Sequence, residues 1–322
     1  MIQIPFAPTI LEHAASLINR TPSECAQSAD LMAQAHIEAF RRYRHPFVTV
    51  GMDIYNIEAE ALGCGVRFFN DVSIPGVDTH PYTIESDPQT IRFDPESGRI
   101  ELLLDAATKI NRSIGSEAKV SVGICGPFSI LIELLGFNVA VDALFEEDER
   151  IDGFLDALLK YLKDYCNLIV SHNLGVTVFD SWAAPPLSSP KIYKSYAAPS
   201  ERKLISHLKS IGLPVQPLVI GGDTSFIIDD ILSTGTTLLV SDYNSPIDLF
   251  AEKAKEHDVT LRANIDPKQI WSGNWDYVQN RINEIRSTFE SYPKIIIGTG
   301  VMPYDTPPEH IFHIKKMLNS TI

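Results

Sequence analysis

The sequence is most informative about the fold at residues 48–66, which read Val48-Thr49-Val50-Gly51-Met52-Asp53-Ile54-Tyr55-Asn56-Ile57-Glu58-Ala59-Glu60-Ala61-Leu62-Gly63-Cys64-Gly65-Val66. The stretch opens with a β-branched apolar run, which is typical of a buried parallel strand. The run ends in a carboxylate, Asp53, and a helical pattern with Glu58 and Glu60 follows it as far as Gly63, the expected C-cap. A (β/α)8 barrel presents catalytic groups in this way, at the carboxyl end of a strand.

The same order of strand, polar tip and helix recurs along the chain. Further apolar segments lie at 119–125, 176–179, 215–220, 237–240, 259–263 and 295–297. Such alternation indicates an α/β fold with a parallel sheet. The count is close to eight, and no Gly-x-Gly-x-x-Gly loop follows the first strand, which argues against a dinucleotide-binding fold. We therefore predict a (β/α)8 TIM barrel rather than an open, doubly wound sheet.

Residues 1–46 are expected to form a helical extension in front of the barrel. Thr21-Pro22-Ser23-Glu24 has the pattern of a capping box with proline at the first helical position. His45-Pro46 ends the helical pattern and leads into the first predicted strand. The barrel is accordingly expected to occupy residues 47–322, and the extension and the barrel together form a single domain.

Composition and charge narrow the class of protein. The chain has 322 residues, 44% of them hydrophobic, and a formal net charge of −14, which argues against nucleic acid or anionic membranes as partners. The four cysteines form no Cys-x-x-Cys pair, and the N-terminus lacks the features of a signal peptide. The apolar region 128–145 is interrupted by polar residues and is predicted to be a buried helix rather than a membrane span. A cytoplasmic location is expected.

Five aspartates lie at or just beyond the carboxyl ends of predicted strands, where a barrel brings them to one mouth: Asp53, Asp180, Asp223, Asp242 and Asp266. Asp223 and Asp266 also fit as N-caps of the helices that follow, whereas Asp53 and Asp180 are expected to face the pocket. Their chemistry stays open: a protonated acid, a site for a cationic substrate group, or oxygen ligands for magnesium. No histidine lies at a strand tip, so a His/Cys zinc site is not expected.

Several of these motifs resemble signatures of the uroporphyrinogen decarboxylase superfamily, in the family order and from about Phe47 onward. They are Asp53-Ile54 with Glu58-Ala59-Glu60-Ala61-Leu62-Gly63-Cys64, Gly126-Pro127-Phe128-Ser129, Phe179-Asp180-Ser181-Trp182, Asn264-Ile265-Asp266-Pro267 and Gly298-Thr299-Gly300. The Glu-Ala-Glu-Ala-Leu-Gly-Cys wording is closer to the corrinoid-dependent methyltransferase branch. The resemblance implies a TIM barrel over nearly the whole chain.

The sequence departs from the decarboxylase pattern at several positions. The family aspartate and serine correspond to Asp53 and Ser181, but the family histidine falls on Thr299 and the family tyrosine on Glu133. The N-terminal arginine-rich motif that grips substrate carboxylates is missing. Decarboxylation of uroporphyrinogen is therefore not expected.

The zinc ligands of the thiol-dependent methyltransferases are missing as well. Their His-x-Cys motif would fall on Val219 and Gly221, and the later cysteine near Gly300. No metal ligand is therefore assigned, and zinc is not expected. Without a metal or a base a thiol remains neutral and is a poor nucleophile.

The resemblance implies a methyltransferase-like enzyme that moves a methyl group between a small donor, a methoxyaromatic ether or a methylated amine, and cobalamin. The chain has no Asp-x-His-x-x-Gly motif, so a separate corrinoid protein is expected to supply the cobalamin. The alternatives are a lyase that acts on a smaller carboxylic acid and a barrel without catalytic activity. The predicted catalytic residues are Asp53, Glu58 and Asp180, and the predicted substrate-binding residues are Tyr55, Asn56, Ser181, Trp182, Asp223, Asp242, Asn264 and Thr299.

Overall fold

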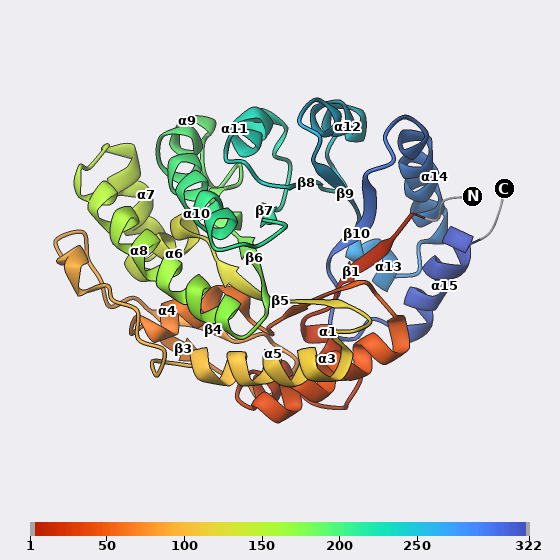
Figure 1. Cartoon of the computed structure of the whole chain (residues 1–322), viewed down its shortest axis with the longest axis horizontal. Helices are drawn as coiled ribbons and strands as arrows, with labels where there is room; N and C mark the ends of the chain where they lie inside the picture. The colour runs from red at the N-terminus through yellow and green to blue at the C-terminus, as the bar shows by residue number, and fades with distance from the viewer. Residues whose placement is uncertain (1–3, 320–322) are drawn as a thin grey trace.

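Eight parallel strands form the centre of the molecule in the computed structural model, which describes residues 4–319 except the side chains of Phe289 and Ser291 (Figure 1). One sheet has the order β2 (Phe47–Val50), β5 (Lys119–Cys125), β6 (Gly175–Phe179), β7 (Leu218–Val219). The other has the order β8 (Leu238–Ser241), β9 (Thr260–Ile265), β10 (Ile295–Val301), β1 (Phe6–Thr9). A parallel bridge between Pro217 and Leu238 joins β7 to β8. This cyclic order is that of a (β/α)8 barrel, which confirms the predicted fold class.

The barrel begins earlier in the chain than the sequence predicted. Strand β1 pairs in parallel with β10, with Phe6 opposite Ile297 and Ala7 opposite Gly298. The expected boundary at Phe47 is therefore wrong for the start of the sheet. The reason is that β1 is only four residues long and contains Pro8, so it lacks the pattern of a buried strand. The rest of the expected extension is helical, as α1 (Glu12–Ser16), α2 (Pro22–Ala26) and α3 (Ala29–Tyr43).

Helices cover the outside of the strands (Figure 1): α5 (Ile100–Ile114), α8 (Arg150–Ser171), α10 (Ala198–Ser210), α11 (Ile228–Ser233), α12 (Ile247–Glu256), α14 (Trp275–Ser291) and α15 (Pro308–Asn319). Their apolar faces bury the outward side chains of the strands in one continuous core. An antiparallel pair, β3 (Gly65–Arg67) and β4 (Gly76–Thr79), lies outside the barrel sheets. This arrangement leaves the carboxyl ends of the strands free to carry a site.

Short helical segments follow several strand ends. After β2 come η1 (Ile54–Asn56) and α4 (Ile57–Ala61), and after β5 come α6 (Pro127–Leu135) and α7 (Phe137–Phe145). After β6 come η3 (Ser181–Ala183), α9 (Pro190–Ile192) and the π-helix η4 (Tyr193–Ala197). η5 (Ser225–Ile227) follows β7, and α13 (Pro267–Trp271) follows β9. A short turn, η2 (Pro88–Thr90), precedes α5.

The apolar region 128–145 forms two helices instead of the single buried helix predicted from the sequence. The break is at Gly136, whose φ of +78° is a conformation that glycine adopts without strain. Helices α6 and α7 are bent by 114° relative to each other. Within residues 4–319 no single helix has the length and hydropathy needed to cross a membrane. The bent pair of α6 and α7 has that length and hydropathy only when the two helices are counted together.

The capping box predicted at the start of α2 is confirmed. Thr21 Oγ1 accepts a hydrogen bond from the Glu24 amide at 3.1 Å, and Glu24 Oε2 accepts one from the Thr21 amide at 2.8 Å. Two amide groups that a helix leaves without partners are thereby satisfied.

We expect Thr21→Ala to lower the free energy of unfolding by about 1 kcal/mol, because the Glu24 amide loses its acceptor at the helix start. Urea denaturation of the purified protein measures this change. Thr83→Ala, at an exposed position outside the helices, is the control and should change stability by less than about 0.5 kcal/mol. Equal effects of the two substitutions would contradict a stabilising cap at Thr21.

Candidate functional site

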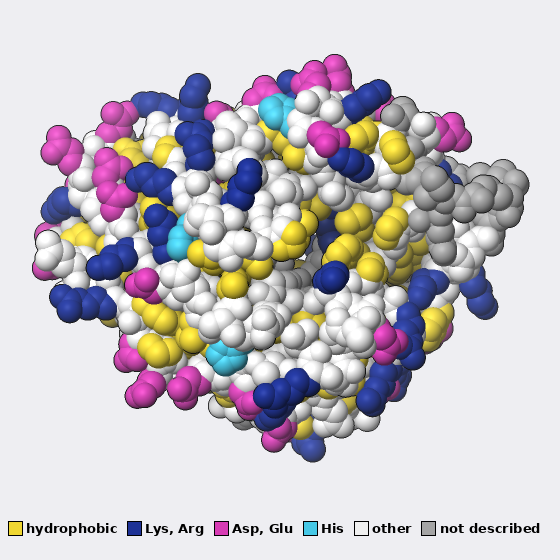
Figure 2. Space-filling model, in the orientation of Figure 1, with side chains coloured by type: hydrophobic (Ala, Val, Ile, Leu, Met, Phe, Trp, Pro, Cys, Tyr) yellow, Lys and Arg dark blue, Asp and Glu magenta, His cyan; other side chains and the backbone are white. Residues whose placement is uncertain are grey.

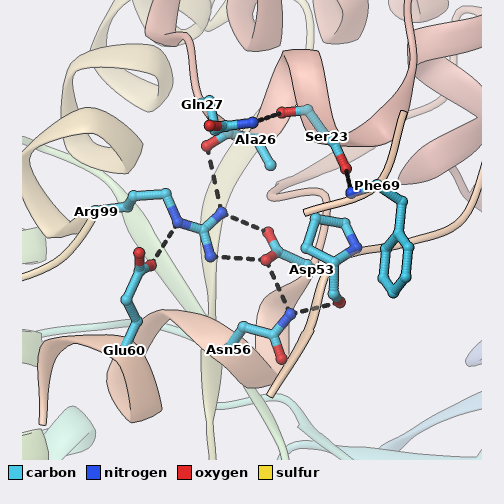
Figure 3. Close-up of polar contacts among 9 residues, drawn as sticks. Ser23, Ala26, Gln27, Asp53, Asn56, Glu60, Phe69 and Arg99 are labelled. Carbon is cyan, nitrogen blue, oxygen red and sulfur yellow. Dashed lines mark hydrogen bonds and ion pairs between the residues drawn. The ribbon is translucent and has the colours of Figure 1, made fainter. Parts of the chain in front are cut away.

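Asp53 follows β2 and is held by the guanidinium of Arg99, at the start of α5 (Figure 3). Arg99 Nη1 donates to Asp53 Oδ1 at 3.0 Å, and Arg99 Nη2 donates to Oδ2 at 2.7 Å. Asn56 Nδ2 also donates to Asp53 Oδ2, at 2.9 Å, and to the Pro75 carbonyl. The Asp53 side chain has no exposed surface. The expectation that Asp53 faces an open pocket is therefore wrong, because this pairing closes around the carboxylate.

Arg99 is the centre of a wider network (Figure 3). Its Nε donates to Glu60 Oε2 at 2.5 Å, and its Nη1 reaches the Ala26 carbonyl at 3.3 Å. The carboxylates of Asp53 and Glu60 thus share one cation, which has 8% side-chain exposure. The role of Arg99 could not be predicted from the sequence, because this residue lies 46 positions from Asp53 in an irregular segment. Asn56, a predicted substrate-binding residue, is buried and donates a hydrogen bond to Asp53.

Glu58 is fully buried on α4. Its Oε1 accepts a hydrogen bond from the Cys125 amide at 3.1 Å, and its Oε2 has no partner among residues 4–319. Burial raises the pKa of Glu58 to about 8. At neutral pH this carboxyl is therefore mostly protonated, which is the state of a proton donor.

Asp180 follows β6 and is fully buried against the first turn of α6. It accepts hydrogen bonds from the Ser129 amide at 2.7 Å, the Ser129 hydroxyl at 2.5 Å and the Phe128 amide at 3.4 Å. Gly126 is required beside it, because a Cβ there would lie 2.3 Å from the Asp180 carboxyl carbon. The expectation that Asp180 faces the pocket is therefore also wrong, since the amides at the start of α6 enclose its carboxylate.

A second carboxyl, that of Glu201, lies beside Asp180. Tyr193 donates its hydroxyl to Glu201 Oε2 at 2.5 Å. Burial, together with repulsion from Asp180, holds the pKa of Glu201 well above its ordinary value, and burial raises the pKa of Asp180 to about 6. The two acids therefore hold at least one proton between them at neutral pH. Glu201 had no signal in the sequence, because it lies in a polar helical stretch.

Ser181 and Trp182 extend from Asp180 in η3. The Gly221 amide donates to Ser181 Oγ at 3.3 Å, which joins the ends of β6 and β7. The Trp182 indole donates to Glu133 Oε1 at 2.8 Å. Trp182 also borders an apolar pocket of about 350 Å³, whose wall includes Phe128, Phe137, Phe145, Pro185 and Leu187. Both predicted binding residues thus keep exposed surface at the mouth of the barrel.

Tyr55 lies inside the barrel among apolar side chains. It packs against a small group formed by Leu11, Ile54 and Phe179, with Val219 at its edge. Burial raises the pKa of the Tyr55 hydroxyl, which lies close to Ser181. The hydroxyl is therefore a neutral donor on the inner side of the mouth.

Asp223 and Asp242 are neighbours at the ends of β7 and β8, and both are half-buried. Asp242 Oδ2 accepts from the Gly222 amide and Oδ1 from the Tyr243 amide, each at 2.9 Å. Asp223 Oδ1 accepts from the Ser225 amide at 3.0 Å and from Ser245 Oγ at 3.4 Å. Asp223 therefore also satisfies the amide of Ser225 in η5, and the two carboxylates form the acidic part of the mouth. Asp266 caps α13 through the Lys268 amide, as the sequence allowed.

Arg262 reaches across the interior of the barrel from β9. Its Nε donates to Asn264 Oδ1 at 3.2 Å, and its Nη2 donates to the Ala7 carbonyl and to Thr9 Oγ1, each at 2.8 Å. Burial lowers the pKa of Arg262 to about 10, so the group stays charged at neutral pH. No carboxylate of residues 4–319 forms an ion pair with it. A lone arginine within the apolar segment 259–263 was a signal that sequence reasoning missed.

The remaining predicted residue, Thr299, is only 1% exposed. Its Oγ1 accepts from the Thr9 amide at 3.0 Å, and its carbonyl accepts from Thr9 Oγ1 at 3.1 Å. Thr299 therefore joins β10 to β1 and does not line the mouth.

The zinc positions of the resemblance hold no ligand side chain. Val219, Gly221 and Gly300 provide neither imidazole nor thiolate, so these residues do not fit a zinc ion. Among residues 4–319, no three His, Cys, Asp or Glu side chains gather in a way that could hold a metal ion.

Comparison with known proteins gives one family. The model of the family described as uroporphyrinogen decarboxylase (URO-D) matches residues 3–320. A methylcobamide:CoM methyltransferase, MtbA, of Methanosarcina acetivorans is 24% identical over 255 residues, which are 78% of this chain and 72% of that protein. A uroporphyrinogen decarboxylase of Prochlorococcus marinus is 25% identical over 316 residues, 93% of this chain and 86% of that protein. The solved structure of a methyltransferase from Methanosarcina mazei superposes with a TM-score of 0.84 at 19% identity, covering 99% of this chain and 94% of that one.

Asp53→Asn should lower the free energy of unfolding by about 3–5 kcal/mol, because it leaves the buried Arg99 without its main counter-charge. Urea denaturation at neutral pH measures the loss. Glu60→Gln is the matched control: this partner keeps 22% side-chain exposure, so the expected cost is about 1 kcal/mol or less. If Asp53→Asn proved no more costly than the control, the buried pair would not hold this part of the barrel together.

Glu58→Gln should become more stable than the wild type as the pH rises from 5 to 8. The folded-state pKa of Glu58, about 8, lies above the ordinary 4.5, so the folded protein keeps a proton that the unfolded chain loses in this window. Wild-type stability therefore falls with rising pH, by up to about 1.4 kcal/mol per unit from this group. Glutamine does not titrate and mimics the neutral acid.

Urea denaturation of both proteins at pH 5, 6, 7 and 8 tests this, because the other buried acids contribute equally to the two curves. Glu101→Gln, at an exposed position on α5, is the control. A difference between Glu58→Gln and the wild type that does not change with pH would contradict a buried, protonated Glu58.

Proposed function

Because the chain belongs to the uroporphyrinogen decarboxylase (URO-D) family, we propose that it is an enzyme of the methyltransferase branch. It moves a methyl group between a small donor and the cobalamin of a separate corrinoid protein. The branch is supported by the similarity to MtbA over about three quarters of the chain together with the missing arginine-rich motif, because the similarity to decarboxylases is of the same size. The choice of donor is supported by the charges at the mouth.

The observation that carries the proposal is the pair of half-buried carboxylates, Asp223 and Asp242, at the ends of two neighbouring strands. Backbone amides and a serine hydroxyl hold both groups in place, so they can receive a cation without rearrangement. A porphyrinogen, which carries several carboxylates, would be repelled here. A methylated amine, which is cationic, would be attracted, and we propose this donor class over a methoxyaromatic ether.

The residues of this chain would bind the donor and keep its nitrogen positively charged. When the C–N bond breaks, the amine leaves with the bonding electron pair, and a nitrogen that carries positive charge leaves as a neutral amine. Reduced cobalamin, carried by the corrinoid partner, would supply the electron pair that forms the new bond to the methyl carbon. Tyr55 and Ser181 line the inner side of the mouth and would orient the donor.

The predicted catalytic acids act indirectly in this proposal. Asp180 binds the start of α6 and so fixes η3, which carries Ser181 and Trp182. Asp53 in the same way fixes η1, which carries Tyr55. Both are positioning residues, as is Glu58, which holds the end of β5 through the Cys125 amide. Asn264 would contact the donor directly from β9.

A corrinoid partner needs an accessible surface near the mouth. Phe145 on α7, Leu187 after β6 and Phe226 in η5 have 71%, 49% and 77% exposure. All three lie in segments that connect a strand end to the helix after it. An apolar rim of this kind is typical of a protein-binding surface, and it supports a partner that docks over the mouth.

The test is a visible spectrum of reduced cobalamin, free or bound to a corrinoid protein, with the purified protein and a panel of methylated amines and methoxyaromatics. We expect the reduced band to convert to the methylated spectrum with an amine. Asp242→Asn should lower kcat/KM for that amine about 10-fold or more, because a charge-assisted contact is lost.

Asp305→Asn is the matched control. It changes the net charge by the same amount at an exposed position outside the acidic part of the mouth, and it should leave the rate unchanged. Conversion to the methylated spectrum with a methoxyaromatic ether, but with no amine, would show that the donor is an ether and not a methylated amine. Absence of conversion with every donor, beside an active corrinoid control, would refute methyl transfer and favour a lyase acting on a small carboxylic acid.

A further inference from the structure

The inner face of β9 carries two polar side chains. Leu261, Ala263 and Ile265 have no exposed surface and pack into the core under the helices. Because side chains alternate along a strand, Arg262 and Asn264 point into the barrel. Arg262 is half-buried, and Asn264 is 7% exposed.

Both side chains have a hydrogen-bond donor that the protein does not use. The Asn264 amide is oriented by Arg262 Nε, which donates to Oδ1, so Nδ2 is the free end. Nδ2 of Asn264 and Nη1 of Arg262 donate to no group of residues 4–319, and neither atom is fully enclosed. Two donors, one of them charged, are therefore available to a molecule in the barrel.

The neighbouring strand leaves space for this arrangement. A Cβ at Gly298 on β10 would lie 2.4 Å from Asn264 Oδ1 and 2.5 Å from Arg262 Nε. Figure 2 shows that the molecule is hollowed near the middle of this face, between the strands labelled β6 and β10 in Figure 1, and that hydrophobic and basic side chains surround the hollow. The hollow lies over the barrel strands, from which Arg262 and Asn264 point inward.

We propose that Arg262 and Asn264 bind the carboxylate of the methyl donor. The inference rests on the proposed function and names the class of its substrate: a donor that carries a carboxylate as well as the methyl group. A planar guanidinium beside an amide N–H matches the two oxygens of a carboxylate. The half-buried charge of Arg262 has lost part of its hydration and has no counter-ion among residues 4–319, and a bound anion would offset that cost.

The acidic part of the mouth is placed for the other end of such a donor. Arg262 pairs in register with Val240 on β8, and Asp242 lies two residues further toward the mouth, about 7 Å along the strand. An amine donor with a carboxylate would place its anion at Arg262 and its cation at Asp242. An N-methylated amino acid has this form, and a methoxybenzoate would use the Arg262 end alone.

The experiment measures binding by titration calorimetry, without any corrinoid, for two matched pairs: N,N-dimethylglycine with its amide, and 4-methoxybenzoate with its amide. We expect the wild type to bind the acid of at least one pair about 10- to 100-fold more tightly than the amide. The pair that shows the preference identifies the donor class. Arg262→Gln should remove the preference.

Arg262 also ties β1 to β9, so a second variant guards against misfolding. Asn264→Asp keeps Arg262 and its contacts with β1 but supplies an internal carboxylate, and it should also remove the preference. Arg92→Gln, the same change at an exposed site, should retain it. The proposal is overturned if neither acid is preferred by the wild type, or if the preference survives both Arg262→Gln and Asn264→Asp.

These outcomes are separate from the fate of the proposed function. Methyl transfer from an uncharged donor, with no preference for carboxylates in binding, would overturn the anion site and leave the methyltransferase in place. Binding of an acid that depends on Arg262, without methyl transfer in the spectral test, would support the site and refute the reaction.

Discussion

The ion pair between Asp53 and Arg99 links more elements of this barrel than any other contact described above. It joins the end of β2 to the start of α5, and through Glu60 and the Ala26 carbonyl it also fixes α4 and α2 (Figure 3). A buried pair adds little stability over a well-packed apolar equivalent, but loss of one partner is costly. The pair therefore specifies one arrangement of the end of β2. This arrangement also sets the position of Tyr55, which lies in η1 directly after Asp53.

The other enclosed acids follow the same constraint with different partners. Asp180 is met by the amide groups at the start of α6, whereas Glu58 has one amide and remains protonated. Burial decides between the two solutions, since a carboxyl without enough donors is more stable neutral. At Asp223 and Asp242 the enclosure is incomplete. These two keep exposed surface and can offer negative charge to a ligand.

The strand pattern predicted most of the barrel, because apolar runs that end in polar tips are local features. Strand β1 was not predicted, because its four residues lack the local pattern of a strand and are recognised only by their pairing with β10. Asp53 and Asp180 are at the strand ends as expected, but their partners could not be predicted. Arg99, beside Asp53, and Glu201, beside Asp180, come from distant segments without a recognisable motif. Arg262 can be recognised in the sequence as a charged residue within an apolar strand. Its conformation depends on Gly298, because a side chain at that position would collide with the guanidinium, and the sequence does not show that the two residues are neighbours.

Charge changes sign along the axis of the barrel. Asp223 and Asp242 lie at the mouth, and Arg262 lies deeper, two residues below Asp242 in register. In a low-dielectric interior this separation acts on a bound molecule more strongly than it would in water. A ligand with one charge of each sign would enter in a single orientation, with its anion inward. Its cationic end would then face the mouth, where a docking partner reaches it, so the order of charges would also set which end of the donor reacts.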